Sequence, residues 1–192
     1  HGGPGLADPP VKVNDKAPAF GLRALDPSGG TAEETVFLDA YLKRAATPQT
    51  TLVLLGFFAS WCAPCKAEFP ALLRIEKAWR ERGFGMLIVN IDREEEGQKA
   101  ALDFIKTQNP PFPVLSDRLN LVVRRYFDTN ITLPTVFLLD GEGTILEIFS
   151  GVDAPVRIEA ALAARLGAKA EDLEPKPVVP TSPTPPSTPR PE

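Results

Sequence analysis

Histidine and cysteine are scarce in this chain of 192 residues, which limits the chemistry available to it. The single histidine is His1, and the two cysteines are Cys62 and Cys65. A structural zinc site takes four ligands, most often cysteine thiolates and histidine nitrogens. Two thiols with no histidine near them in the sequence do not provide such a set. We therefore predict no metal site, and nothing in the sequence indicates another cofactor.

Long apolar runs and clusters of positive charge are missing as well. The longest strongly apolar run, from Leu52 to Ala59, is far shorter than the roughly 20 residues that span a bilayer. The net charge of −4 and the lack of a Lys/Arg cluster argue against nucleic acid as a partner. Because the chain begins with His1 rather than Met, we expect that an upstream segment was removed, such as a signal peptide or an N-terminal membrane anchor. Such an anchor is the only contact with a membrane that we expect.

Proline is concentrated at the two ends of the chain. The first ten residues hold three glycines and three prolines, which is typical of an unstructured lead-in. Eight prolines lie between Pro175 and Pro191, and such a segment favours extended polyproline II and buries little surface. We predict a flexible lead-in at 1–10, one folded domain at 11–168 and a proline-rich disordered tail at 169–192.

Between these ends, strand patterns and helix patterns alternate. Continuous apolar runs and the turn sequence DGEG predict two buried strands, at 50–58 and 84–92, and a hairpin at 135–151. Apolar residues at helical spacing predict helices at 63–82, at 94–109 and from about 155 to 167. The alternation predicts an α/β domain with a mixed sheet flanked by helices.

The two cysteines stand three positions apart in the sequence WCAPC, residues 61–65. A disulfide across so small a loop stabilises the fold by roughly 2 kcal/mol or less, which is a weak reason for the only cysteine pair of the domain. Cys62 precedes a predicted helix, whose free backbone N–H groups and positive dipole end favour a thiolate. Cys65 follows one turn later, within reach of Cys62, and Pro64 suits a first helical turn. We interpret the pair as a reactive dithiol rather than a structural staple or half of a metal site.

The segment FFASWCAPCKAEFP, residues 57–70, resembles the active site of thioredoxin-fold thiol:disulfide oxidoreductases. The resemblance is to the extracytoplasmic TlpA-like and ResA-like branch of the redoxins, and it extends over about 16–166. It includes FPVLSD at 112–117, TLPTVFLLDGEG at 132–143 and the closing glycine Gly151. It implies a thioredoxin fold with an N-terminal β-hairpin extension and a central insertion between residues 92 and 125.

The resemblance also assigns roles to individual residues. It implies that Cys62 attacks a substrate disulfide and that Cys65 resolves the mixed disulfide that results. Pro134 would be a cis-proline opposite the pair, although X–Pro bonds are cis in only about 5–6% of cases, so a proline that opens an edge strand is the alternative. The backbone around Leu133 would pair with an extended substrate segment. The residues expected to contact the substrate are Trp61, Ala63, Pro64, Leu133 and Pro134.

Glu68 is the third candidate for a catalytic residue. It follows Cys65 by three positions, so both project from one face of the predicted helix. In the TlpA-like branch a glutamate at this place takes part in proton handling, and it would accept the proton of the resolving thiol. Many cytoplasmic thioredoxins instead carry a buried aspartate six residues before the first cysteine, where this chain has Gly56. The alternative is that Glu68 is a solvated acid favoured by the helix dipole.

Taken together, the resemblance implies an enzyme of the bacterial periplasm or cell envelope that reduces protein disulfides, with apocytochrome c among the candidate substrates. Its expected partners are substrate proteins and an upstream thiol electron donor, and we expect a monomer. A peroxide-reducing relative would carry a threonine where this chain has Ala59, and a copper-delivering relative would need wider cysteine spacing and a histidine. A module that binds thiol-containing client proteins without turning them over remains the alternative from another class.

Overall fold

The computed structural model describes residues 10–25, 34–45 and 52–167. Most of the predicted lead-in and the whole predicted tail lie outside the described residues, so the division at 1–10, 11–168 and 169–192 stays a prediction.

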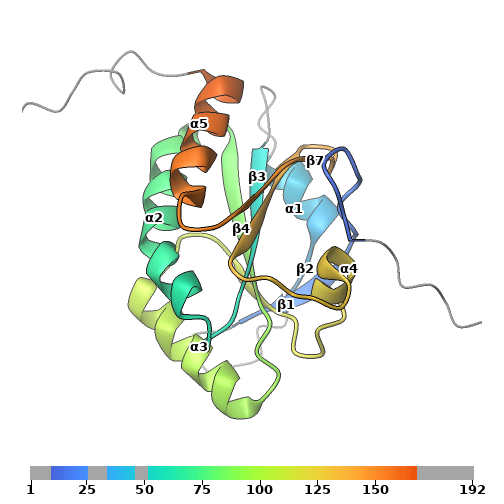
Figure 1. The fold of residues 1–192 in the computed structure, drawn as a ribbon, viewed down its shortest axis with the longest axis vertical. Coiled ribbons are helices and arrows are strands. Elements are labelled where there is room, and N and C mark those ends of the chain that lie inside the picture. The colour runs from blue at the N-terminus through green and yellow to red at the C-terminus, as the bar shows by residue number, and fades with distance from the viewer. Residues whose placement is uncertain (1–9, 26–33, 46–51, 168–192) are drawn as a thin grey trace, which may run out of the picture.

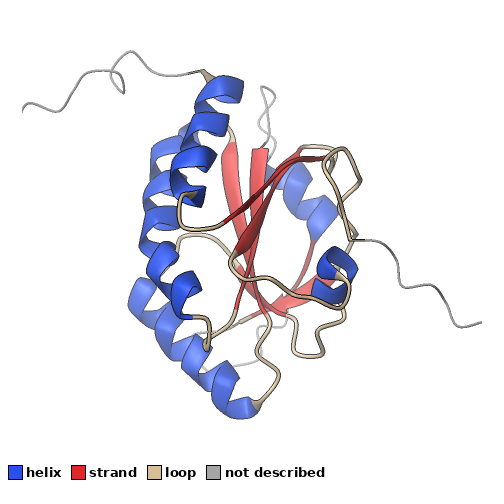
Figure 2. Cartoon of the chain, in the orientation of Figure 1, coloured by secondary structure: helices blue, strands red, loops and turns tan. Residues whose placement is uncertain are grey.

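Seven strands of the described chain form one sheet in the order β2-β1-β5-β4-β3-β6-β7. The strands are β1 (Gly21–Ala24), β2 (Thr35–Phe37), β3 (Leu52–Phe58), β4 (Phe84–Asn90), β5 (Val114–Ser116), β6 (Thr135–Asp140) and β7 (Ile145–Ser150). The helices are α1 (Leu38–Ala45), α2 (Ala63–Trp79), α3 (Glu95–Gln108), α4 (Val123–Phe127) and α5 (Ala154–Leu166), with a 3-10 turn at Arg80–Arg82. Figure 1 shows α2, α3 and α5 on one side of the sheet and α1 and α4 on the other, and Figure 2 shows the same layers by element type.

The sheet is mixed, as the sequence predicts. Strand β3 pairs in parallel with β4 and antiparallel with β6, and β6 and β7 form the predicted hairpin. The antiparallel pair β1 and β2 is the N-terminal hairpin extension, and α3 with β5 forms the insertion between residues 92 and 125. The thioredoxin fold with both additions is therefore confirmed.

Several boundaries differ from the sequence prediction. The helix expected to end at residue 82 ends at Trp79, because the chain tightens into the 3-10 turn and then reverses at Gly83, whose φ of 85° suits glycine. The strand expected to reach residue 92 ends at Asn90. Helices α1 and α4 were not predicted, since their eight and five residues give too short an apolar period.

Strand β3 is the centre of the core, and each of its seven residues is buried. Successive side chains point to opposite faces of a strand, so Phe57 and Phe58 anchor two aromatic clusters. Phe57 contacts Tyr126 and Phe137 with ring centroids 5.2 and 6.1 Å apart. On the side of the sheet that α2 and α3 cover, the ring centroids of Phe58 and Phe69 are 6.1 Å apart. Packing on both faces fixes the end of β3, from which the cysteine turn leaves.

The outer edges of the sheet are partly covered. Residues 14–17 run beside the start of β7, where the N–H of Asn14 donates to the carbonyl of Ile145 and the N–H of Ala17 to that of Gly143, both at 2.8 Å. Inside the sheet, β5 reaches β4 only at residues 88–90 of β4. Beside this short pairing, the hydroxyl of Tyr41 on α1 donates to the carbonyl of Met86 in β4, at 2.6 Å.

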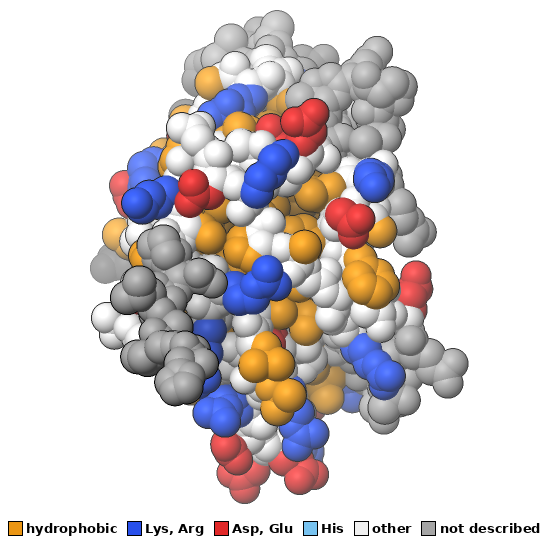
Figure 3. Space-filling model, turned by 90° about the vertical axis from the view of Figure 1, so that its right-hand side faces the viewer, with side chains coloured by type: hydrophobic (Ala, Val, Ile, Leu, Met, Phe, Trp, Pro, Cys, Tyr) orange, Lys and Arg blue, Asp and Glu red, His pale blue; other side chains and the backbone are white. Residues whose placement is uncertain are grey.

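Charge is spread over the surface rather than gathered. Figure 3 shows Lys and Arg side chains interspersed with Asp and Glu over one face, with apolar side chains along its middle. Across the three described ranges, none of the helices combines the length and apolarity that crossing a membrane requires.

Candidate active site

The cysteine pair lies where β3 ends and α2 begins. Cys62 and Cys65 form a disulfide with their Cα atoms 5.3 Å apart. Cys62 is the N-cap residue of α2, and its Sγ accepts the backbone N–H of Cys65 at 3.2 Å. Pro64 lies in the first helical turn, where its missing N–H costs no hydrogen bond. A sulfur at this position receives both a backbone donor and the positive end of the helix dipole, which together favour a thiolate once the pair is reduced.

The residues around the pair are much more exposed than the pair itself. Trp61 is 68% exposed, and Ala63 and Pro64 are also exposed, while Cys62 and Cys65 are only 5% and 4% exposed. The disulfide form therefore does not distinguish the two sulfurs by exposure, and the N-cap position is what separates them. The exposed rim provides apolar surface against which a protein substrate can lie.

Pro134 immediately precedes β6, the antiparallel neighbour of β3. The Leu133–Pro134 peptide bond is cis, as the resemblance implied. Thr135, the next residue, pairs with Phe57 near the end of β3. Pro134 and Cys65 both line one small cavity, so the proline lies on the inner side of the dithiol.

Glu68 lines the same small cavity together with Gly56, Cys65 and Pro134. Its side chain is half-buried, and its Oε1 atom is fully buried with no hydrogen-bond partner among the described residues. Burial disfavours the charged carboxylate and raises the pKa of Glu68 above its ordinary value. A carboxyl with these surroundings is placed beside the pair and is not a fully solvated acid, although its part in proton transfer stays a proposal.

Gly56 has no side chain, and this leaves room for the cavity that it lines. A Cβ atom at position 56 would lie 2.8 Å from Cδ1 of Ile88 and 3.1 Å from Cγ1 of Val136, inside van der Waals contact. The strand therefore does not accept the aspartate of cytoplasmic thioredoxins without displacing its neighbours, and the carboxyl group that lines this cavity is that of Glu68 on α2.

We predict that Gly56→Ala lowers the free energy of unfolding by about 1–3 kcal/mol, because the added methyl group overpacks the buried space between Ile88 and Val136. Chemical denaturation of the oxidised protein, followed by circular dichroism, measures the change. A variant as stable as the wild type would show that Ile88 and Val136 give way, and that Gly56 is not required by packing.

Two further residues of the surrounding loops were not predicted. Val152 is fully exposed and follows β7, whose Ser150 pairs with Thr135, so the loop at 151–153 lies beside Pro134. Asp92 accepts hydrogen bonds from Ser60, two residues before Cys62. The sequence offered a signal only for the first, since the resemblance included Gly151.

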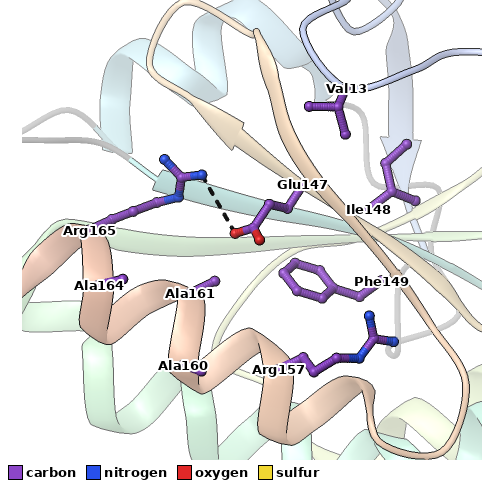
Figure 4. Close-up of a pocket in the computed structure, with 9 residues that line it drawn as sticks. All are labelled: Val13, Glu147, Ile148, Phe149, Arg157, Ala160, Ala161, Ala164 and Arg165. Carbon is purple, nitrogen blue, oxygen red and sulfur yellow. Dashed lines mark ion pairs between the residues drawn. The ribbon is translucent and has the colours of Figure 1, made fainter.

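The site is distinct from a wider hollow elsewhere on the described surface. That hollow lies between β7 and α5, where Glu147 and Arg165 form an ion pair at 3.6 Å and Arg157 lies over the ring of Phe149 (Figure 4). None of its lining residues is a predicted site residue. Among the described residues there is also no group of three or more His, Cys, Asp and Glu side chains that could hold a metal ion.

Comparison with known proteins gives consistent matches over most of the chain. The AhpC/TSA family matches residues 13–148. The thiol-disulfide oxidoreductase ResA of Oceanobacillus iheyensis is 30% identical over 152 residues, which are 79% of this chain and 71% of that protein. ResA of Bacillus subtilis is 34% identical over 99 residues, which span about half of each protein, 52% of both.

The match to two solved structures of similar fold extends over nearly the whole of each solved chain. A thiol:disulfide interchange protein of the thioredoxin family from Chlorobium tepidum TLS has a TM-score of 0.61 at 25% identity, covering 82% of this chain and 99% of that one. StoA from Bacillus subtilis has a TM-score of 0.55 at 25% identity, covering 75% of this chain and 96% of that one.

Proposed function

We propose that this chain, a thiol-disulfide oxidoreductase that belongs to the AhpC/TSA family, reduces disulfide bonds of proteins outside the cytoplasm. The observation that carries the proposal is the disulfide between Cys62 and Cys65 at the start of α2, with Pro134 on its inner side. Within the proposed reaction, Cys62 is the nucleophile and Cys65 the resolving thiol.

The reaction proceeds through two exchanges of sulfur partners. The Cys62 thiolate attacks one sulfur of a substrate disulfide, so a bond forms between Cys62 Sγ and that sulfur while the substrate disulfide breaks. The released substrate thiolate takes up a proton. Cys65 then attacks Cys62 Sγ, which frees the second substrate thiol and leaves the Cys62–Cys65 disulfide. Two electrons have passed to the substrate, and an upstream dithiol must reduce the pair before the next cycle.

Two features of the structure support these roles. The N–H of Cys65 donates to Cys62 Sγ, which lowers the free energy of a thiolate at that sulfur. Cys65 must lose its own proton before it attacks, and Glu68 lines the same cavity. A carboxyl whose pKa is raised by burial is a better base near neutral pH than an ordinary one, so Glu68 is suited to accept that proton.

The substrate is proposed to lie across the exposed rim of the pair. Trp61, Ala63 and Pro64 offer surface on one side, and the backbone at Leu133 offers strand pairing on the other. We propose exported thiol proteins as the substrates, including apocytochrome c, and a monomeric enzyme. The resemblance to the TlpA-like and ResA-like branch supports this location and substrate class, as does Gly56 in place of the cytoplasmic aspartate.

Insulin reduction in the presence of dithiothreitol tests the activity, and equilibration with glutathione tests the direction. We expect catalysis above the rate of dithiothreitol alone, and a potential nearer to about −270 mV than to about −120 mV. A chain that binds client thiols without catalysis would be a holding module. A potential near the upper value would make the protein an oxidant, and rapid consumption of hydrogen peroxide by the reduced chain would favour a peroxide-reducing relative.

A further inference from the structure

A buried carboxylate lies behind the turn that carries the cysteine pair. Asp92 follows β4 and is only 2% exposed. Its carboxylate accepts three hydrogen bonds: from the N–H of Ser60 at 2.8 Å, from Ser60 Oγ at 2.7 Å and from Asn90 Nδ2 at 2.6 Å. No ion pair neutralises Asp92 within the described part of the chain, so these donors alone compensate the removal of its charge from water.

Ser60 occupies the middle of the turn between β3 and α2. The N–H of Cys62 donates to the carbonyl of Ala59 at 3.0 Å, which closes a four-residue turn with Ser60 and Trp61 at its centre. Asp92 binds both the backbone and the side chain of Ser60, from 32 positions further along the chain. The turn is therefore attached to the end of β4 at the residue that precedes Trp61.

The carboxylate meets its partners with both of its oxygens. Oδ2 accepts the N–H of Ser60 and Asn90 Nδ2, which can only donate, and Oδ1 accepts Ser60 Oγ, a hydroxyl that can also accept. Removing both oxygens, as in Asp92→Ala, therefore takes away every contact that the side chain makes with the turn.

We propose that Asp92 is a positioning residue of the disulfide exchange, which fixes Ser60 so that Trp61 stays on the outer rim and Cys62 Sγ faces the N–H of Cys65. Asp92 touches neither the substrate nor the sulfur atoms, and it acts through Ser60. The assignment rests on the proposed function, because it concerns a step of that reaction.

Helix α3 restricts the carboxylate from its other side. A Cβ atom at Gly97 would lie 2.6 Å from Asp92 Oδ1 and 3.2 Å from its Cγ. Replacing a glycine inside a helix by alanine normally stabilises the helix. Here Gly97→Ala must displace the carboxylate, which loosens the bonds to Ser60 without changing any charge or any hydrogen-bonding group.

The experiment compares Ser60→Ala and Gly97→Ala with two controls. Ser60→Thr keeps the hydroxyl group, and Lys99→Ala changes an exposed residue of α3 away from the carboxylate. In a Cys65→Ser background, the alkylation rate of Cys62 at fixed pH and its thiolate absorbance titration report on the nucleophile alone. Insulin reduction with the cysteine pair intact reports on turnover, and the thermal midpoint reports on stability.

We expect Ser60→Ala and Gly97→Ala to slow alkylation and to lower kcat/KM by about three- to tenfold, as for the loss of one ordinary hydrogen bond. The thiolate titration should move to higher pH, because the sulfur loses its fixed donor. Ser60→Thr and Lys99→Ala should match the wild type. In an Asp92→Ala background, where the acceptor oxygens are gone, Ser60→Ala should have a smaller further effect on alkylation, since the two residues act as one unit.

Variants that lower the thermal midpoint while alkylation and titration stay unchanged would overturn the proposal and leave Asp92 a purely structural residue. Equal effects of Ser60→Ala in both backgrounds would also overturn it. Alkylation needs no protein substrate, so a wild type that reduces no insulin contradicts the proposed function while the role of Asp92 is still decided by the thiol measurements.

Discussion

Cys62→Ser is expected to reduce the catalysed reduction of insulin to the rate of dithiothreitol alone, and Cys65→Ser to stop the reaction at a mixed disulfide. The physical reason is the asymmetry of the helix start. Cys62 caps α2 and accepts the N–H of Cys65, so its thiolate is the stabilised one. A serine hydroxyl at position 62 is not ionised at neutral pH and does not attack a disulfide. Without the Cys65 thiol, the bond between Cys62 and the substrate has no internal nucleophile to break it.

Non-reducing gels and mass spectrometry detect the trapped complex, which should contain one substrate chain attached through Cys62. The double variant Cys62→Ser, Cys65→Ser is the control and should trap nothing. Alkylation of the reduced wild type at limiting reagent gives an independent check, since it should label Cys62 first. Preferential labelling of Cys65, or a complex trapped by Cys62→Ser instead, would reverse the two roles.

Glu68→Gln is expected to change the thiols in two opposite ways. The carboxylate is a like charge for a thiolate, so its removal should lower at least one cysteine pKa. Its removal also takes away the base that we propose for Cys65, so exchange near pH 7 should slow by at least about tenfold. Thiolate absorbance titrations of wild type and variant, with Cys65→Ser versions in parallel, separate the first effect from the second. Superimposable titrations with unchanged exchange would make Glu68 irrelevant to the chemistry.

Glu68→Gln should also change the pH dependence of stability, which can be measured on the oxidised protein without following the thiols. Burial raises the pKa of Glu68 in the folded chain. Between the ordinary pKa of an unfolded glutamate and this higher value, the folded state binds more protons than the unfolded state, so the free energy of unfolding falls as pH rises. Glu68→Gln removes this contribution. Denaturant unfolding of the oxidised proteins from pH 4 to 8 should therefore show a smaller loss of stability with rising pH in the variant, while Glu96→Gln, on the exposed face of α3, should follow the wild type.

The sequence predicted the parts of the site that depend on near neighbours in the chain. The spacing of Cys62 and Cys65, and the helix that follows them, are local features that a motif and a hydrophobic period express directly. The cis bond at Pro134 came only from the resemblance, because a proline alone does not fix its isomer. The mixed sheet followed from the alternation of strands and helices, whereas the N-terminal hairpin and the central insertion came from the resemblance.

The contacts made across the fold were beyond prediction. Ser60 and Asp92 meet because β3 and β4 lie side by side in a register that pairs Phe58 with Asn90, and no local pattern encodes that register. The burial of Glu68 Oε1 depends on β6 closing the small cavity, so the sequence left a solvated acid open as the alternative. Helix α1 was missed for lack of length, although its Tyr41 contacts β4.

The covered edges of the sheet bear on self-association of the protein. An open strand at the edge of a sheet can pair with the same strand of another copy, which is a route to aggregation. Here residues 14–17 occupy the start of the β7 edge, β2 on the opposite edge is only three residues long, and Tyr41 takes up a carbonyl that β5 leaves free in β4. Backbone pairing between copies is thereby discouraged at these places, whereas the backbone at Leu133 is where we propose that a substrate strand pairs.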